Sequence, residues 1–210
     1  MNSSHKKMHK GFEGKKGLTI VESLVAISIL MIAVLGPLVV VSQAFKISFF
    51  ARDQMTAFYL AQESIEYVRN ARDRNSLTQE DPADWLDGIA VDSAGVPIAI
   101  TVNDIGAPAP VKYQLVRSGT SYRLLMCGGT PSTCPKVRYT SSTGLYGTET
   151  GGTQSVYTRE ITFTKVPDDP AAEQEISVKV LMTWNQVGGT YKFPLYEHLT
   201  NWKIQNYEGS

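Results

Sequence analysis

The chain has 210 residues, of which 42% are hydrophobic and 19% are charged, and its 20 basic side chains are balanced by 20 acidic ones. This composition excludes a disordered polyelectrolyte, and the zero net charge argues against a protein that binds nucleic acid through a basic surface. Two cysteines are too few for a disulfide scaffold, and neither a CxxC pair nor a Cys/His cluster with zinc spacing is present.

The first 17 residues form a basic leader with a single acidic residue, Glu13; the five lysines are Lys6, Lys7, Lys10, Lys15 and Lys16. Residues 18–41 then form a run of 24 residues with one ionisable group, Glu22. A helix of that length rises about 36 Å, enough to cross a hydrocarbon core of about 30 Å. Basic residues directly before a membrane span predict a cytoplasmic N-terminus, with the rest of the chain outside.

Two simpler interpretations compete with this one. A secretory signal peptide has an apolar core of about 7–15 residues. The run here is longer and contains a carboxylate, although Ser42 and Ala44 loosely fit a cleavage site. A plain signal anchor, in which Glu22 has no role, stays open, because a carboxylate near the start of a span costs less than one at mid-membrane.

The residues around Glu22 distinguish these interpretations. Residues 15–24 read KKGLTIVESL: a basic leader that ends in Gly17, a hydrophobic residue at Leu18, and Glu22 as the fifth residue after the glycine. This pattern resembles the cleavage and methylation motif of type IV prepilins and type II secretion pseudopilins. One departure is Leu18, because the family more often has Phe at that position.

The resemblance implies that a prepilin peptidase at the cytoplasmic membrane face cuts between Gly17 and Leu18, and that the new amine of Leu18 is N-methylated. Gly17 suits this role, because a residue without a side chain lets a protease approach the backbone. Glu22 lies one helical turn after Leu18, at the positive end of the helix dipole. In the family this Glu neutralises the amine of a neighbouring subunit; a bond to its own Leu18 amine stays open.

Gly36 and Pro37 fall inside the apolar run. Proline removes a backbone hydrogen bond, so we expect this pair to kink or loosen the helix. The resemblance implies local melting near such a proline in assembled filaments. A kink in a lone anchor is the alternative, since Gly and Pro are frequent in membrane helices.

After the apolar run, residues 42–75 predict an amphipathic continuation of the same helix, which we expect from about Leu18 to about Arg72, with a stop at Asn75-Ser76. The apolar residues recur at steps of three or four. They are Ala44, Ile47, Ala51, Met55, Phe58, Ala61, Ile65 and Val68. This stripe is predicted to pack against the rest of the protein.

Residues 76–210 predict a β-rich head, because short β-branched runs alternate with turn signals. The expected strands are Ile98–Val102, Val111–Val116, Tyr122–Met126, Val156–Thr164, Ile176–Trp184 and Tyr191–Leu199. Pro194 in the last run indicates an edge strand or a break. A helix followed by a strand meander predicts an α+β fold, in which the helix packs on an antiparallel sheet. The resemblance implies a pilin-like version of this fold.

Cys127 and Cys134 are seven residues apart, around the loop GGTPST. Such a short loop can bring the two sulfurs together, and an exported head lies in an oxidising compartment. We therefore expect a disulfide; two free thiols are the alternative in a reducing setting.

No catalytic constellation is evident, and we expect neither an enzyme nor a cofactor or metal. His5 and His9 lie in the leader, and His198 is expected to be a partly exposed strand residue. Residues 140–153 lack the Lys-Ser/Thr ending of a phosphate loop and are expected to form a long mobile connection. Asp168-Asp169 offers too few ligands for calcium.

These observations predict the precursor of a minor pilin or pseudopilin that is processed after Gly17. Its expected partners are the prepilin peptidase/methyltransferase, other pilin-like subunits and the inner-membrane assembly machinery, with no nucleic acid. The precursor is expected in the cytoplasmic membrane, and the mature subunit in a surface pilus or periplasmic pseudopilus that serves adhesion, motility, secretion or DNA uptake. The alternative is a single-pass adhesion protein that does not polymerise, with residues 127–153 as its contact surface.

Overall fold

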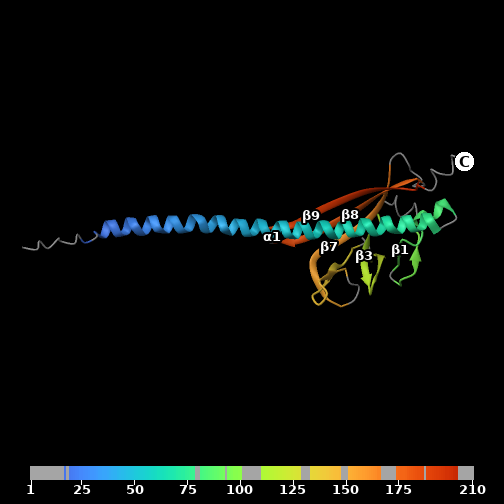
Figure 1. The fold of residues 1–210 in the computed structure, drawn as a ribbon, viewed down its shortest axis with the longest axis horizontal. Helices are drawn as coiled ribbons and strands as arrows, with labels where there is room; N and C mark the ends of the chain where they lie inside the picture. Colours follow the sequence, from blue (N-terminus) through green and yellow to red (C-terminus); the bar gives the residue numbers. More distant parts are fainter. Residues whose placement is uncertain are drawn as a thin grey trace, which may run out of the picture. The chain divides into compact units, whose positions relative to one another are not determined.

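The structure, a computed structural model, describes residues 17, 19–78, 81–92, 94–100, 110–128, 133–147, 151–166, 174–186 and 188–202 (Figure 1). The leader before Gly17, the scissile residue Leu18 and the pair Asp168-Asp169 lie outside the described residues. The chain divides into two units, residues 1–49 and residues 50–210.

Helix α1 spans Ile20–Thr78 and has 59 residues. The expected continuous helix is confirmed, but it runs past the stop predicted at Asn75-Ser76. The reason lies in the Asn75 side chain, whose Nδ2 donates to the carbonyls of Trp85 at 3.2 Å and Asp87 at 2.6 Å. Asn75 is therefore buried and joins the end of α1 to the following 3₁₀ helix η1, Pro82–Leu86.

The face of α1 that packs in the second unit begins at Phe50, whose ring centroid lies 5.0 Å from that of Tyr191. Its buried residues are Ala57, Leu60, Ala61, Ser64, Ile65, Val68, Ala71, Asn75 and Ser76. The predicted stripe is correct from Ala61 onward, but Met55 is 57% exposed. The predicted stripe differs from the buried face because Ala and Ser occupy much of that face, and both residue types contribute little to a hydrophobic pattern.

Within its described residues, the second unit carries a nine-stranded sheet. Its strands are β1 Ala90–Val91, β2 Pro97–Ile98, β3 Tyr113–Ser118, β4 Ser121–Met126, β5 Lys136–Thr140, β6 Leu145–Tyr146, β7 Thr153–Lys165, β8 Glu175–Gln186 and β9 Gly189–Thr200. The order is β2-β1-β4-β3-β7-β5-β6, and β8 joins β7 to β9. The general α+β layout is confirmed. The sheet is mixed rather than purely antiparallel, because β1 pairs with β4 in parallel.

Five of the expected strands correspond to β3, β4, β7, β8 and β9. The sixth, Ile98–Val102, shares only Ile98 with β2; residues 99 and 100 are not in a strand, and residues 101 and 102 lie outside the described residues. Strands β1, β5 and β6 were not predicted, and β6 corrects the expectation of an unstructured connection over 140–153. Its two residues pair with the end of β5 through Tyr139–Tyr146 and Thr140–Leu145. Strands of two residues are too short to show the alternation from which a strand is predicted.

Strands β7, β8 and β9 form the longest antiparallel ribbon of the sheet and run beside α1 (Figure 1). The inward side chains of the central strand β8 are all buried: Ile176, Val178, Val180, Met182 and Trp184. Among the described strands β9 pairs only with β8, so it is an edge strand that includes Pro194, as expected.

The proline lies on the free side of this edge strand. The N–H of Asn201 donates to the carbonyl of Gln174 at 2.6 Å, which marks that pair as hydrogen-bonded. Hydrogen-bonded and non-bonded pairs alternate along an antiparallel ladder. The uninterrupted register then makes Leu181–Pro194 a non-bonded pair. The missing N–H of Pro194 therefore faces the open edge and removes no bond to β8.

Candidate functional site

The first candidate site is the N-terminal end of α1. Gly17 is exposed and not helical, and the helix begins at Ile20. Thr19 is the N-cap residue: its Oγ1 accepts a hydrogen bond from the N–H of Glu22 at 3.2 Å, and its carbonyl accepts one from the N–H of Ser23 at 3.1 Å. These two bonds fix where the helix starts.

Thr19 was missed at the sequence level, although a signal was present. Thr19 and Glu22 are spaced as Thr-x-x-Glu directly before an apolar run, which is the pattern of a capping box. The cleavage motif specifies Gly17, Leu18 and Glu22, and Thr19 occupies one of the three mostly apolar positions between Leu18 and Glu22.

The Glu22 carboxylate is exposed in the first turn of α1. Within the described part of the chain it takes part in no ion pair or side-chain hydrogen bond. Leu18 lies outside the described residues, so both expected partners of Glu22, its own Leu18 amine and that of a neighbouring subunit, stay predictions.

The helix that follows presents an apolar surface. Apart from the half-buried Ser23, every side chain from Ile20 to Phe49 is exposed within its unit. In the ranges that the structure describes, α1 is the one helix long and apolar enough to cross a membrane by length and composition. Its uncharged stretch, residues 23–45, ends at Lys46 and corresponds to a rise of about 35 Å.

Gly36 and Pro37 lie within this stretch, and α1 is continuous through both. Pro37 has no N–H to donate to the carbonyl of Ala33, so this turn has one backbone hydrogen bond fewer than its neighbours. A Cβ added at Gly36 would meet no atom within 4 Å. Local weakening at this turn stays a prediction.

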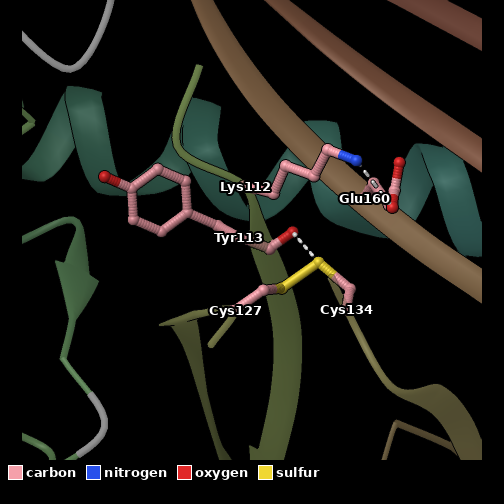
Figure 2. The surroundings of a disulfide bond; sticks show 5 residues. All are labelled: Lys112, Tyr113, Cys127, Cys134 and Glu160. Atoms are coloured by element: carbon pink, nitrogen blue, oxygen red, sulfur yellow. Dashed lines mark hydrogen bonds and ion pairs between the residues drawn. A yellow bond between two sulfur atoms is a disulfide. The ribbon is translucent and has the colours of Figure 1, made fainter. Parts of the chain in front are cut away.

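The second candidate site is the disulfide, which Figure 2 shows with its surroundings. Cys127 and Cys134 are bonded, with their Cα atoms 4.9 Å apart, which confirms the pairing expected from the short loop. The N–H of Cys127 donates to the carbonyl of Lys112 at 2.8 Å. Sγ of Cys134 lies 3.7 Å from the carbonyl oxygen of Tyr113, a contact without a hydrogen bond because an oxidised sulfur carries no proton. The bridge thus lies beside the start of β3.

A third group of polar side chains joins α1 to the sheet. The side chain of Arg159, on β7, is only 1% exposed. Its Nη1 donates to Glu63 Oε2 at 2.8 Å and to the carbonyl of Leu60 at 3.0 Å, and its Nη2 donates to the carbonyl of Leu115 at 2.5 Å. One guanidinium therefore connects α1, β7 and β3.

Burial perturbs the titration of this group. Burial lowers the pKa of Arg159, and the nearby Glu63 carboxylate opposes that shift. Burial also raises the pKa of Tyr122, and the charge of Glu63 and a hydrogen bond to it raise it further. Arg159 was missed at the sequence level, although Tyr157, Ile161 and Phe163 alternate with it on the inward face of β7. A charged residue in register with such a row is a signal for a buried ion pair.

His198 lies on the edge strand β9 and is 59% exposed, which confirms the expected partly exposed strand residue. Its Nδ1 lies 2.7 Å from Glu175 Oε1. Within the described residues, no three His, Cys, Asp or Glu side chains are grouped so that they could hold a metal ion.

The structure thus places Gly17, Thr19 and Glu22 together at the start of α1, and the two cysteines together in the head. Gly36 and Pro37 lie farther along α1 than Glu22. No protein-family model, curated protein or solved structure matches the chain.

Proposed function

We propose that the chain is the precursor of a type IV pilin-like subunit, a minor pilin or a pseudopilin, which is cleaved after Gly17 and assembled through its N-terminal helix. The observation that carries this proposal is that the end of the basic leader, the glycine and the start of an apolar helix follow one another directly along the chain. A basic leader ends at an exposed, non-helical Gly17, and an apolar, exposed helix with an acidic first turn starts three residues later.

The exposed apolar helix supports the proposal on energetic grounds. Burying one Val, Leu, Ile or Met side chain contributes about 1.5–3 kcal/mol. The surface from Ile20 to Phe49 therefore favours an apolar environment strongly. A bilayer provides that environment to the precursor, and the helices of other subunits provide it to the mature chain. Soluble monomeric proteins rarely expose an apolar surface of this size to water.

Processing changes the balance between these two environments. Cleavage removes Lys15 and Lys16, which hold the precursor at the cytoplasmic face. The mature chain begins with an apolar residue, Leu18, and its new amine is the one positive charge at the start of the helix. Glu22 then supplies a carboxylate of opposite charge one turn away.

The direct test is co-expression with a prepilin peptidase. We expect loss of the 17-residue leader and a mature chain that starts at Leu18, as read by N-terminal sequencing of the membrane fraction. A chain that keeps its leader under conditions where a known prepilin is cut would contradict the proposal. It would favour the permanently anchored adhesion protein.

Glu22→Gln tests assembly separately from cleavage. Gln keeps the capping-box pattern at this position but removes the charge. We expect normal processing and about a tenfold loss of incorporation into filaments, because a buried amine then lacks its charged partner. Filament fractions probed by immunoblotting give the measurement. Glu66→Gln is the matched control on the same helix, since the side chain of Glu66 is 69% exposed and pairs only with Arg69 among the described residues. If the Glu22 variant and wild type were incorporated equally, Glu22 would have no role in assembly.

A further inference from the structure

The start of α1 lies two residues after the proposed cleavage point. Thr19 Oγ1 accepts from the N–H of Glu22, and the Thr19 carbonyl accepts the first intrahelical bond, from Ser23. Gly17 is therefore outside the helix, and its carbonyl is not part of the helical hydrogen-bond ladder. Because the first helical residue is Ile20, the peptide bond that follows Gly17 precedes the cap.

An alternative start exists in the same sequence. Glycine is nearly as good an N-cap residue as threonine, whereas valine and alanine are poor ones. If Thr19 lost its hydroxyl, Gly17 would be the nearest upstream residue able to serve as the cap. The Gly17 carbonyl would then accept from the N–H of Val21, and the following peptide bond would become the first of the helix.

A helical scissile bond is a poor protease substrate. Hydrolysis breaks the C–N bond between Gly17 and Leu18: water supplies a hydroxyl to the Gly17 carbonyl carbon and a proton to the Leu18 nitrogen. The attacked carbonyl oxygen must be free to accept hydrogen bonds from the enzyme as negative charge develops on it. A carbonyl already bonded to Val21 is not free in this sense.

We propose that Thr19 is a positioning residue for this processing step: its hydroxyl caps α1 at Ile20 and so keeps the Gly17 carbonyl out of the helical hydrogen bonds, open to the peptidase. This inference rests on the proposed function. Thr19 itself takes no part in the chemistry.

The test compares four variant precursors with the wild type in vesicles with purified prepilin peptidase, with initial cleavage rate as the readout. Thr19→Val keeps the shape but loses the hydroxyl, and its rate should fall roughly two- to fivefold. Thr19→Ser and Thr19→Asn should cleave like wild type, because both residues are good caps. Ser28→Ala is the matched control: it removes another exposed helix hydroxyl, bonded to the Leu24 carbonyl at 2.8 Å, without touching the cap.

The asparagine variant separates capping from direct recognition of the threonine hydroxyl by the peptidase. Asn caps a helix but has no hydroxyl, so slow cleavage of Thr19→Asn beside normal cleavage of Thr19→Ser would overturn the proposal. Equal rates for Thr19→Val and wild type would also overturn it. A wild-type precursor that is not cleaved at all would instead contradict the proposed function.

A second readout follows the backbone itself. The carbonyl and Cα carbon-13 shifts of Gly17 and Leu18, measured in bicelles, should move toward helical values in Thr19→Val and stay at wild-type values in Thr19→Asn. Unchanged shifts in Thr19→Val would overturn the capping mechanism even if its cleavage were slow.

Discussion

Replacing Arg159 by alanine is expected to lower the free energy of unfolding of the head by about 2–4 kcal/mol, the largest effect of any single charged residue described here. The side chain is 1% exposed and donates to Glu63 and to the carbonyls of Leu60 and Leu115. Its removal leaves a cavity, two buried carbonyls that lose a donor, and a carboxylate without its partner. The range lies below that of a fully buried pair because the Glu63 side chain is 32% exposed.

The measurement is thermal unfolding of the full chain in detergent micelles, followed by near-ultraviolet circular dichroism. For a head of this size, the expected loss lowers Tm by about 5–15 °C. Arg52→Ala is the matched control, since its ion pair with Asp53 involves a side chain that is 70% exposed and should contribute less than about 1 kcal/mol. Arg159→Met should recover part of the loss by filling the cavity. Similar Tm values for the Arg159→Ala and Arg52→Ala variants would show that the buried pair does not hold the helix on the sheet.

Replacing Gly17 by valine is expected to reduce cleavage by prepilin peptidase about a hundredfold or more, because a branched side chain next to the scissile bond displaces the backbone from the enzyme. The structure makes this variant easy to interpret. A Cβ added at Gly17 meets no atom within 4 Å, and Gly17 does not have the positive φ that would require glycine. The chain itself tolerates the side chain, so lost cleavage would report on contact with the peptidase.

Gly36→Ala is the control for that experiment. An added Cβ at Gly36 also meets nothing within 4 Å, and Gly36 lies inside α1, far along it from the cleavage point. Cleavage of the Gly36 variant should match wild type. Normal cleavage of Gly17→Val, read by N-terminal sequencing, would show that the peptidase does not require glycine before Leu18.

The long elements of the fold could be predicted because each repeats one signal over many residues. The apolar run before Lys46 indicates a helix, and the alternation from Ile176 to Trp184 indicates a half-buried strand. The parallel pairing of β1 with β4 could not be predicted, because two residues carry no period and their partners lie more than 30 positions away along the chain. The local sequence makes Asn75 a stop signal, because its tertiary partners, two carbonyls near η1, lie outside that local sequence.

The candidate sites also differ in whether their residues lie close together along the chain. Cys127 and Cys134 are close along the chain, so their pairing could be predicted from the loop between them. Arg159 and Glu63 are 96 positions apart, and only the folded sheet brings them together. The pattern at Gly17 and Glu22 is visible in the sequence as a resemblance, whereas the hydrogen bond from the N–H of Glu22 to Thr19 Oγ1 depends on where the helix starts.

Pro194 has a consequence for the outer edge of the sheet. Strand β9 has 12 residues, and no described strand covers its outer edge. An uncovered edge of such a strand is a template for strands from other molecules, the first step toward aggregation. Because the missing N–H of Pro194 faces outward, the row of donors along the edge is broken near its middle. A second strand therefore cannot form hydrogen bonds along the whole edge. This limits the joining of two heads, edge to edge, into one continuous sheet at high local concentration.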